Sequence, residues 1–219
     1  MIDSTPALIE AVATADSAKA LLAAVEALAA RQDPLAIPTL IAVLGYNNPG
    51  AAVAAVEGLV ALGEPVIPQL LEQIDTYNYG ARAWAVRVFA RIGDPCALDL
   101  LIDSALNDFS QSVRRAAAKG LGNILWHKLP QTEVASTQER VFTTLVQILS
   151  DGEWVVRYAA IVGLESLALT SEYLVPKVIV QLETMAATES DSTLRARIAL
   201  ALQKVVNHIK FGERGRGEG

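Results

Sequence analysis

The sequence contains few of the residues that enzymes most often use for chemistry. Its 219 residues include one cysteine, Cys96, and two histidines, His127 and His208. A single cysteine excludes an internal disulfide, a four-thiolate metal site and a two-cysteine redox couple. Neither histidine has another metal-ligating residue at a suitable spacing, and no glycine-rich phosphate loop follows a strand pattern. We therefore expect no catalytic residue, no metal and no cofactor, and we predict that Cys96 is a small buried residue.

Charge and long apolar runs are also scarce. Charged residues make up 19% of the chain, and the formal net charge is −6. Because a negative protein repels phosphate backbones and anionic headgroups, we expect neither a nucleic-acid nor a membrane partner. No stretch of about 18 residues lacks both charge and turn signals, and the first residues do not have the pattern of a signal peptide. These features predict a cytoplasmic protein.

Aromatic residues make up only 5% of the chain, whereas 52% of the residues are hydrophobic. Such a core of small aliphatic side chains suits close-packed helices. One arginine-containing, alanine-rich phrase occurs three times, at residues 80–95, 112–124 and 155–167. Self-similarity with a period near 30 residues is typical of a solenoid, because one helical pair cannot bury its apolar face without a neighbour. The sequence therefore predicts an all-α fold, an α-solenoid.

The copies align on the residue that we predict at the start of each second helix. These anchor positions are Leu21, Ala52, Arg82, Arg114, Arg157 and Arg195. Apolar or small residues follow each anchor at helical spacing, and shorter apolar segments precede it at residues 37–44, 67–74, 97–102 and 141–149. We predict about five to six helical hairpins that stack into a curved superhelix, as a single repeat domain over residues 1–210.

Glycine and proline predict where the hairpins end. Gly63 and Gly93 each come shortly before a proline, so each glycine can close one helix in a left-handed conformation. Residues 127–138 lack a helical pattern and are predicted to form an inserted loop. Residues 211–219 alternate glycine with charge, which predicts a disordered C-terminal tail.

Four of the anchor positions are arginines, and each follows a turn that contains an aspartate. The pairs are Asp75 with Arg82, Asp108 with Arg114, Asp151 with Arg157, and Asp191 with Arg195. An aspartate can cap the helix that follows it, and an arginine can bind carboxylates and carbonyls in two places at once. We interpret this arrangement mainly as a structural ladder between repeats.

Residues 75–84 differ from the rest of the chain, because they concentrate three of its few aromatic residues. Rings beside guanidinium groups can hold a flat, conjugated ligand that carries carboxylates. Ordinary helix packing and turn chemistry explain the segment equally well, so both interpretations stay open at this point. The candidate site residues are Asp75, Tyr77, Tyr79, Arg82, Trp84 and Arg87.

Three segments of the sequence, residues 44–50, 77–84 and 112–122, resemble the E/F-type phycobilin lyases of cyanobacteria. The motif order over about residues 5–208 is similar to that of the shorter, F-type subunit. The resemblance implies HEAT-like repeats and a longer, E-type partner. It also implies a reaction in which the pair attaches phycocyanobilin through a thioether to a cysteine of the phycocyanin alpha chain.

The resemblance also assigns roles to the six candidate residues. The bilin would be a substrate, its propionates held by the arginines, its conjugated face by the rings and its pyrrole nitrogens by Asp75. Orienting the bilin for the approaching thiol supplies rate without a protein nucleophile. Isomerising relatives are expected to carry an adjacent His-Cys pair, which this sequence lacks. We therefore predict simple ligation.

Three other functions remain open from the sequence. A non-enzymatic, phycobilisome-associated HEAT protein could use the same surface in pigment binding or turnover. A generic scaffold with no link to pigment would have similar repeats. A HEAT-like DNA glycosylase is disfavoured by the negative net charge.

Overall fold

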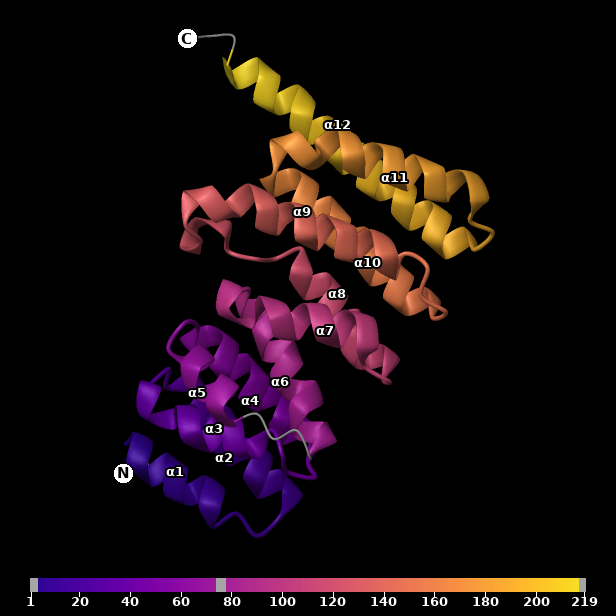
Figure 1. Ribbon diagram of the computed structural model, residues 1–219. Helices are drawn as coiled ribbons and strands as arrows, with labels where there is room; N and C mark the ends of the chain where they lie inside the picture. Colours follow the sequence, from indigo (N-terminus) through magenta and orange to yellow (C-terminus); the bar gives the residue numbers. More distant parts are fainter. Residues whose placement is uncertain (1–3, 74–77, 217–219) are drawn as a thin grey trace. The chain divides into compact units, whose positions relative to one another are not determined.

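The computed structural model describes residues 4–73 and 78–216, and every regular element in this part is helical. In these two stretches of the chain, twelve α-helices follow one another as six consecutive pairs, which confirms the predicted all-α class and the number of hairpins (Figure 1). The helices divide into two compact units, Met1–Ala97 and Leu98–Gly219. Each unit contains three hairpins.

The first unit contains the hairpins α1–α2, α3–α4 and α5–α6. Its second helices pack in order, α2 on α4 and α4 on α6. An N-cap side chain, Ser17, Asn48 or Asn78, accepts a backbone N–H at the start of each of them, which satisfies a donor that the helix leaves open. The helix bounds are α1 Thr5–Ala13, α2 Ala18–Ala30, α3 Ile37–Val43, α4 Pro49–Leu62, α5 Val66–Gln73 and α6 Tyr79–Ile92.

The second unit contains the hairpins α7–α8, α9–α10 and α11–α12, with α8 packed on α10 and α10 on α12. The first of these contacts is so close that it requires glycine. A Cβ at Gly163 would lie 2.8 Å from the carbonyl oxygen of Ala118, and one at Gly122 would lie 2.7 Å from the Cα of Gly163. The helix bounds are α7 Leu98–Asn107, α8 Gln111–Leu121, α9 Gln131–Ile148, α10 Trp154–Thr170, α11 Val175–Thr188 and α12 Ser192–Arg216.

The predicted repeat register is confirmed in all six hairpins. Each anchor position is the fourth residue of its second helix, from Leu21 in α2 to Arg195 in α12. The predicted helix-closing glycines also have positive φ, 71° at Gly63 and 73° at Gly93. Sequence spacing therefore predicted the register of the second helices correctly, although each helix begins three residues before the position predicted as its start.

Two sequence predictions are wrong. Residues 127–138 do not form an inserted loop, because α9 already begins at Gln131 and includes the rest of that stretch. Its polar residue Gln138 is buried and accepts a hydrogen bond of 2.9 Å from the hydroxyl of Ser171, which a polarity pattern cannot show. Cys96 is exposed rather than buried, because it lies in the short 3₁₀ helix Pro95–Ala97 at the surface.

The end of the chain differs from the expected tail in one respect. Helix α12 continues to Arg216 and so includes most of the stretch predicted to be disordered, while residues 217–219 lie outside the described residues. The single repeat domain over residues 1–210 stays a prediction, since the structure describes two compact units.

Candidate functional site

Helix α6 carries the residues that the sequence singled out, and its core-facing side anchors it. Ala85, Val88 and Phe89 are buried in the first unit. Another side of the same helix carries Trp84 and Arg87, both half-buried. Because neither residue is sealed in the core, both are accessible in part to a ligand.

Four of the six candidate residues are described, and they form two stacked pairs on α6. The Cζ of Arg87 lies 4.5 Å from the ring centroid of Trp84, and the Cζ of Arg82 lies 5.6 Å from that of Tyr79. A hydrogen bond of 2.8 Å from Arg87 Nη1 to the carbonyl of Ala83 fixes the first pair further. Stacked guanidinium and indole groups present an aromatic edge and a cation together, which suits a conjugated acid.

The other two candidate residues, Asp75 and Tyr77, lie outside the described residues. Their assignment to the site, like that of the other four, stays a prediction.

Sequence reasoning missed an ion pair next to this surface. Arg91 of α6 binds the carboxylate of Glu57 of α4 through its two terminal nitrogens, Nη1 and Nη2, with 2.8 Å between Nη2 and Oε2. The hydrogen bond from Arg91 lowers the pKa of Glu57 below its usual value. The pair ties the two second helices together on the exposed side. The 30-residue repeat could have revealed it, because it places Glu57 one helical turn before the position in α4 that corresponds to Arg91.

The predicted arginine ladder is confirmed in the second unit. Arg114 binds the carboxylate of Asp151 in the next repeat, with Nε–Oδ2 of 2.8 Å and Nη2–Oδ1 of 3.1 Å. Its Nη1 also donates to the carbonyl oxygens of Asp108 and Phe109 in its own turn. One guanidinium therefore holds two successive turns.

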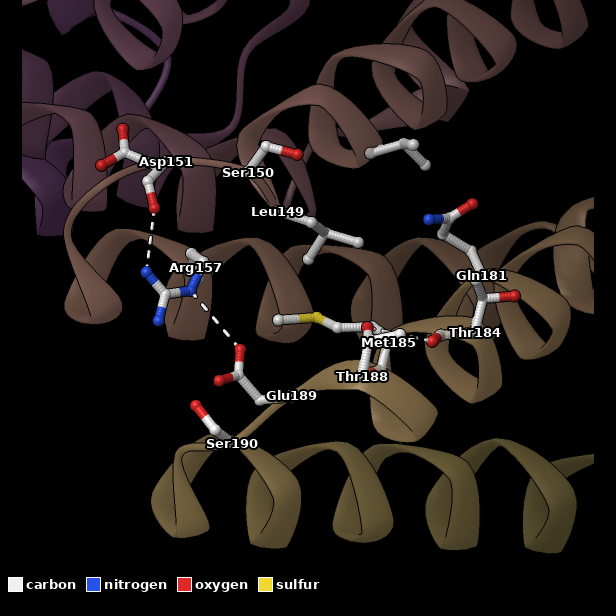
Figure 2. A pocket seen from close by; sticks show the side chains of 11 residues that line it. Leu149, Ser150, Asp151, Arg157, Gln181, Thr184, Met185, Thr188, Glu189 and Ser190 are labelled. Atoms are coloured by element: carbon white, nitrogen blue, oxygen red, sulfur yellow. Dashed lines mark hydrogen bonds and ion pairs between the residues drawn. The ribbon is translucent and has the colours of Figure 1, made fainter.

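The next step of the ladder repeats this pattern (Figure 2). Arg157 Nη1 donates to the carbonyl of Asp151 at 2.9 Å, and its Nε lies 3.6 Å from Oε2 of Glu189 in the following turn. Arg195 likewise donates to the carbonyls of Glu189 and Ser190. The carbonyls belong to the arginine's own turn and the carboxylates to the next repeat, a division of partners that the sequence did not show. The first step, from Asp75, lies outside the described residues.

A buried charge cluster joins the last two second helices, and no sequence pattern indicated it. Oε2 of Glu165 on α10 lies 2.6 Å from Nη2 of Arg197, and Oε1 lies 2.9 Å from Nζ of Lys204. The ring of Tyr158 lies 5.6 Å from the Cζ of Arg197. The cluster serves packing, because Glu165 and Arg197 are almost fully enclosed.

Two general features bear on function. Among the described residues, no group of three or more His, Cys, Asp or Glu side chains is placed to hold a metal ion. Within the same part of the chain, no helix is both long and apolar enough to span a membrane.

Comparison with known proteins first establishes the class. The family model for HEAT repeats matches residues 5–79 and 67–136. A designed armadillo repeat protein has the same fold, with a TM-score of 0.55 at 16% identity over 92% of this chain and 99% of its own. The chain is thus a HEAT-repeat α-solenoid protein, as its hairpins and their register indicate.

More similar relatives narrow this class. The "Phycocyanin alpha phycocyanobilin lyase CpcF" of Synechocystis sp. is 52% identical over 90% of this chain and 92% of its own length. The "Phycocyanobilin lyase subunit beta" of Nostoc sp. is also 52% identical, over 90% of this chain and 98% of its own. A chain in the solved complex of CpcE and CpcF of phycocyanin lyase from Nostoc sp. PCC7120 is 54% identical, with a TM-score of 0.72 over 77% of this chain and 99% of its own. The chain belongs to the family of phycocyanobilin lyase beta subunits.

Proposed function

We propose that this protein is one subunit of a heterodimeric bilin lyase. With an E-type partner, it attaches phycocyanobilin through a thioether bond to a cysteine of the phycocyanin alpha chain. Relatives of half-identical sequence carry the lyase name, and a 54% identical chain has been solved in complex with CpcE. These names favour ligation over the alternative of a non-enzymatic pigment-binding protein. A cytoplasmic location belongs to the same proposal.

The observation that supports a bilin site in this chain is the stacked pair Trp84–Arg87. An open-chain tetrapyrrole offers a conjugated face and two propionates, and the pair offers a ring and a cation 4.5 Å apart. Tyr79 and Arg82 repeat the combination on the same helix. Asp75 and Tyr77, which precede α6 in the sequence and lie outside the described residues, belong to the same proposed site.

The chemistry that this site must support is the addition of a thiol across the ethylidene double bond of the bilin. The sulfur of the acceptor cysteine bonds to the ethylidene carbon, and the thiol proton passes to the bilin, so no oxidant is needed. The chain binds the bilin in one conformation, and orientation supplies the rate. Phycocyanobilin is then a substrate, and no cofactor or catalytic side chain of this chain takes part.

The test is a reconstitution with the E-type subunit, phycocyanobilin and apo-phycocyanin alpha chain. Trp84→Ala and Arg87→Ala should each slow formation of the covalent, red-absorbing adduct by at least about tenfold. A tenfold change corresponds to the loss of one contact with the bilin worth about 1.4 kcal/mol. Both should leave the free energy of unfolding within about 1 kcal/mol of the wild type. Leu35→Ala, which truncates a side chain that is 65% exposed in the short 3₁₀ helix Pro34–Ala36 of the first unit, is the control and should react normally.

A core variant separates binding from folding. Phe89 is fully buried in the same helix, so Phe89→Ala should cost about 3–5 kcal/mol. If Trp84→Ala and Arg87→Ala unfold the protein as strongly as Phe89→Ala, α6 has a packing role only. If the wild-type protein and the E-type subunit together yield no covalent adduct, the proposed lyase function is wrong.

A further inference from the structure

The turns inside the hairpins of the second unit expose large aromatic side chains. Phe109, between α7 and α8, is 76% exposed, and Trp154, at the start of α10, is 47% exposed. Apolar surface of this size on a soluble protein commonly marks a contact site for another protein. We call the turns 108–110, 151–153 and 189–191, together with Trp154, the turn edge.

The arginine ladder holds this edge in a fixed arrangement. Arg114 donates to the carbonyl of Phe109 at 3.2 Å and binds the carboxylate of Asp151, which in turn accepts the N–H of Glu153 at 2.8 Å. The backbones that carry the two rings are therefore joined through one side chain. A fixed backbone reduces the entropy that these turns lose on binding, which suits aromatic side chains on them to an interface.

A cavity of about 420 Å³ adjoins the Asp151 turn between α9 and α11 (Figure 2). Val146, Leu149 and Met185 supply the small apolar part of its surface, and the ion pair of Arg157 with Glu189 lies at one end of it. Around them are neutral hydroxyl and amide groups from Ser150, Gln181, Thr184, Thr188 and Ser190. The lining is mostly polar, so the cavity can accept a polar or cationic side chain of a partner beside the exposed rings.

The charge of the turn edge indicates what the partner must offer. The edge has two more carboxylates than guanidiniums, because three arginines neutralise only part of the acidic residues in these turns. A complementary surface therefore needs cations around an apolar centre. The acidic residues are Asp108, Asp151, Glu153, Glu189 and Asp191, and the arginines are Arg114, Arg157 and Arg195.

The geometry points to the turn edge as the surface that binds the E-type partner subunit, an inference that rests on the proposed function. A permanent partner can keep Phe109 and Trp154 covered, and permanent interfaces are the more apolar ones. The acceptor protein must leave after each reaction, which favours a more polar and weaker contact. The exposed rings thus fit the lyase partner rather than the phycocyanin alpha chain.

The test measures pairing alone, without bilin or acceptor. Phe109→Ala and Trp154→Ala should each weaken binding to the E-type subunit by about 30-fold, the equivalent of an anchor residue worth about 2 kcal/mol. Thr188→Trp, which fills the cavity from an exposed position, should also weaken pairing. Leu35→Ala is the matched control, because it truncates a side chain that is 65% exposed in the first unit.

Circular dichroism melting of each variant alone checks that folding is unchanged, and size-exclusion chromatography with titration calorimetry measures the pairing. Loss of pairing in the ring variants, with Leu35→Ala normal, supports the inference. Unchanged pairing in the Phe109→Ala/Trp154→Ala double variant overturns it. This experiment measures binding of the E-type subunit without the reaction. If the wild-type subunits bind each other but form no adduct with bilin and acceptor, only the proposed function is contradicted.

Discussion

Neutralising Glu165 should destabilise the second unit far more than an ordinary charge change. The carboxylate is the hydrogen-bond partner of Arg197, whose side chain is 5% exposed and whose Nη1 is buried without a partner among the described residues. Glu165→Gln keeps the shape but leaves a buried guanidinium with no opposite charge. Breaking a buried pair in this way costs about 3–5 kcal/mol.

Removing both charges should restore most of that loss. Glu165→Leu/Arg197→Met replaces the pair by apolar side chains, which is often nearly neutral because no charge then has to leave water. The free energy of unfolding of the double variant should therefore lie within about 1–2 kcal/mol of the wild-type value. Its loss of stability should be much smaller than the summed losses of the two single variants. Lys204 is half-exposed, so Lys204→Ala should cost less than about 1 kcal/mol.

Urea unfolding followed by circular dichroism measures the wild type, Glu165→Leu, Arg197→Met and the double variant, which are the four corners of the cycle, with Glu165→Gln beside them. Glu183→Gln, an exposed change on α11, is the control and should stay within about 0.5 kcal/mol. The effect of Glu165→Gln should persist at 0.5 M salt. Salt ions screen a buried pair of charges 2.6 Å apart much less than they screen exposed charges. A cost below about 1 kcal/mol, or a double variant as unstable as the summed single variants, would refute the reasoning.

Two further predictions concern the junctions between repeats. Gly163→Ala should lower stability by about 1–3 kcal/mol in urea unfolding, because its Cβ would meet the carbonyl of Ala118. Gly152→Ala, with nothing within 4 Å, should change little, and equal effects would contradict the close approach. Burial raises the pKa of Asp151, but hydrogen bonds from Arg114 and a backbone amide outweigh this effect and lower the pKa below its usual value. This carboxylate's stabilisation is therefore complete above the unfolded-state pKa and is lost as the pH falls below about 4, so Asp151→Asn should show a shallower acid loss of stability in urea midpoints.

The fold could be predicted from the sequence because repeats carry their own register. The anchors Arg82, Arg114 and Arg157 each lie at the same position of a second helix, so aligning the copies located the helices. The failed loop prediction at residues 127–138 had a physical cause. The polar residues there pack through Gln138 and its bond to Ser171, a contact 33 residues away that no local pattern encodes.

The candidate site was only partly predictable. Local spacing put Trp84 and Arg87 on one side of α6, and the structure stacks them. Glu57 was missed because its partner Arg91 lies in the next repeat, and an ion pair of this kind depends on how two helices pack.

Sequence alone determined the repeats, the helix register and the family resemblance, because these follow from short-range spacing and residue identity. Tertiary structure alone decided which arginine binds which turn and that Glu165 and Arg197 are buried together. It also decided that the exposed Phe109 and Trp154 lie on turns that Arg114 connects. The reason is that a solenoid forms each helix from nearby residues but completes every charge pair and every buried face only when the next hairpin packs against it.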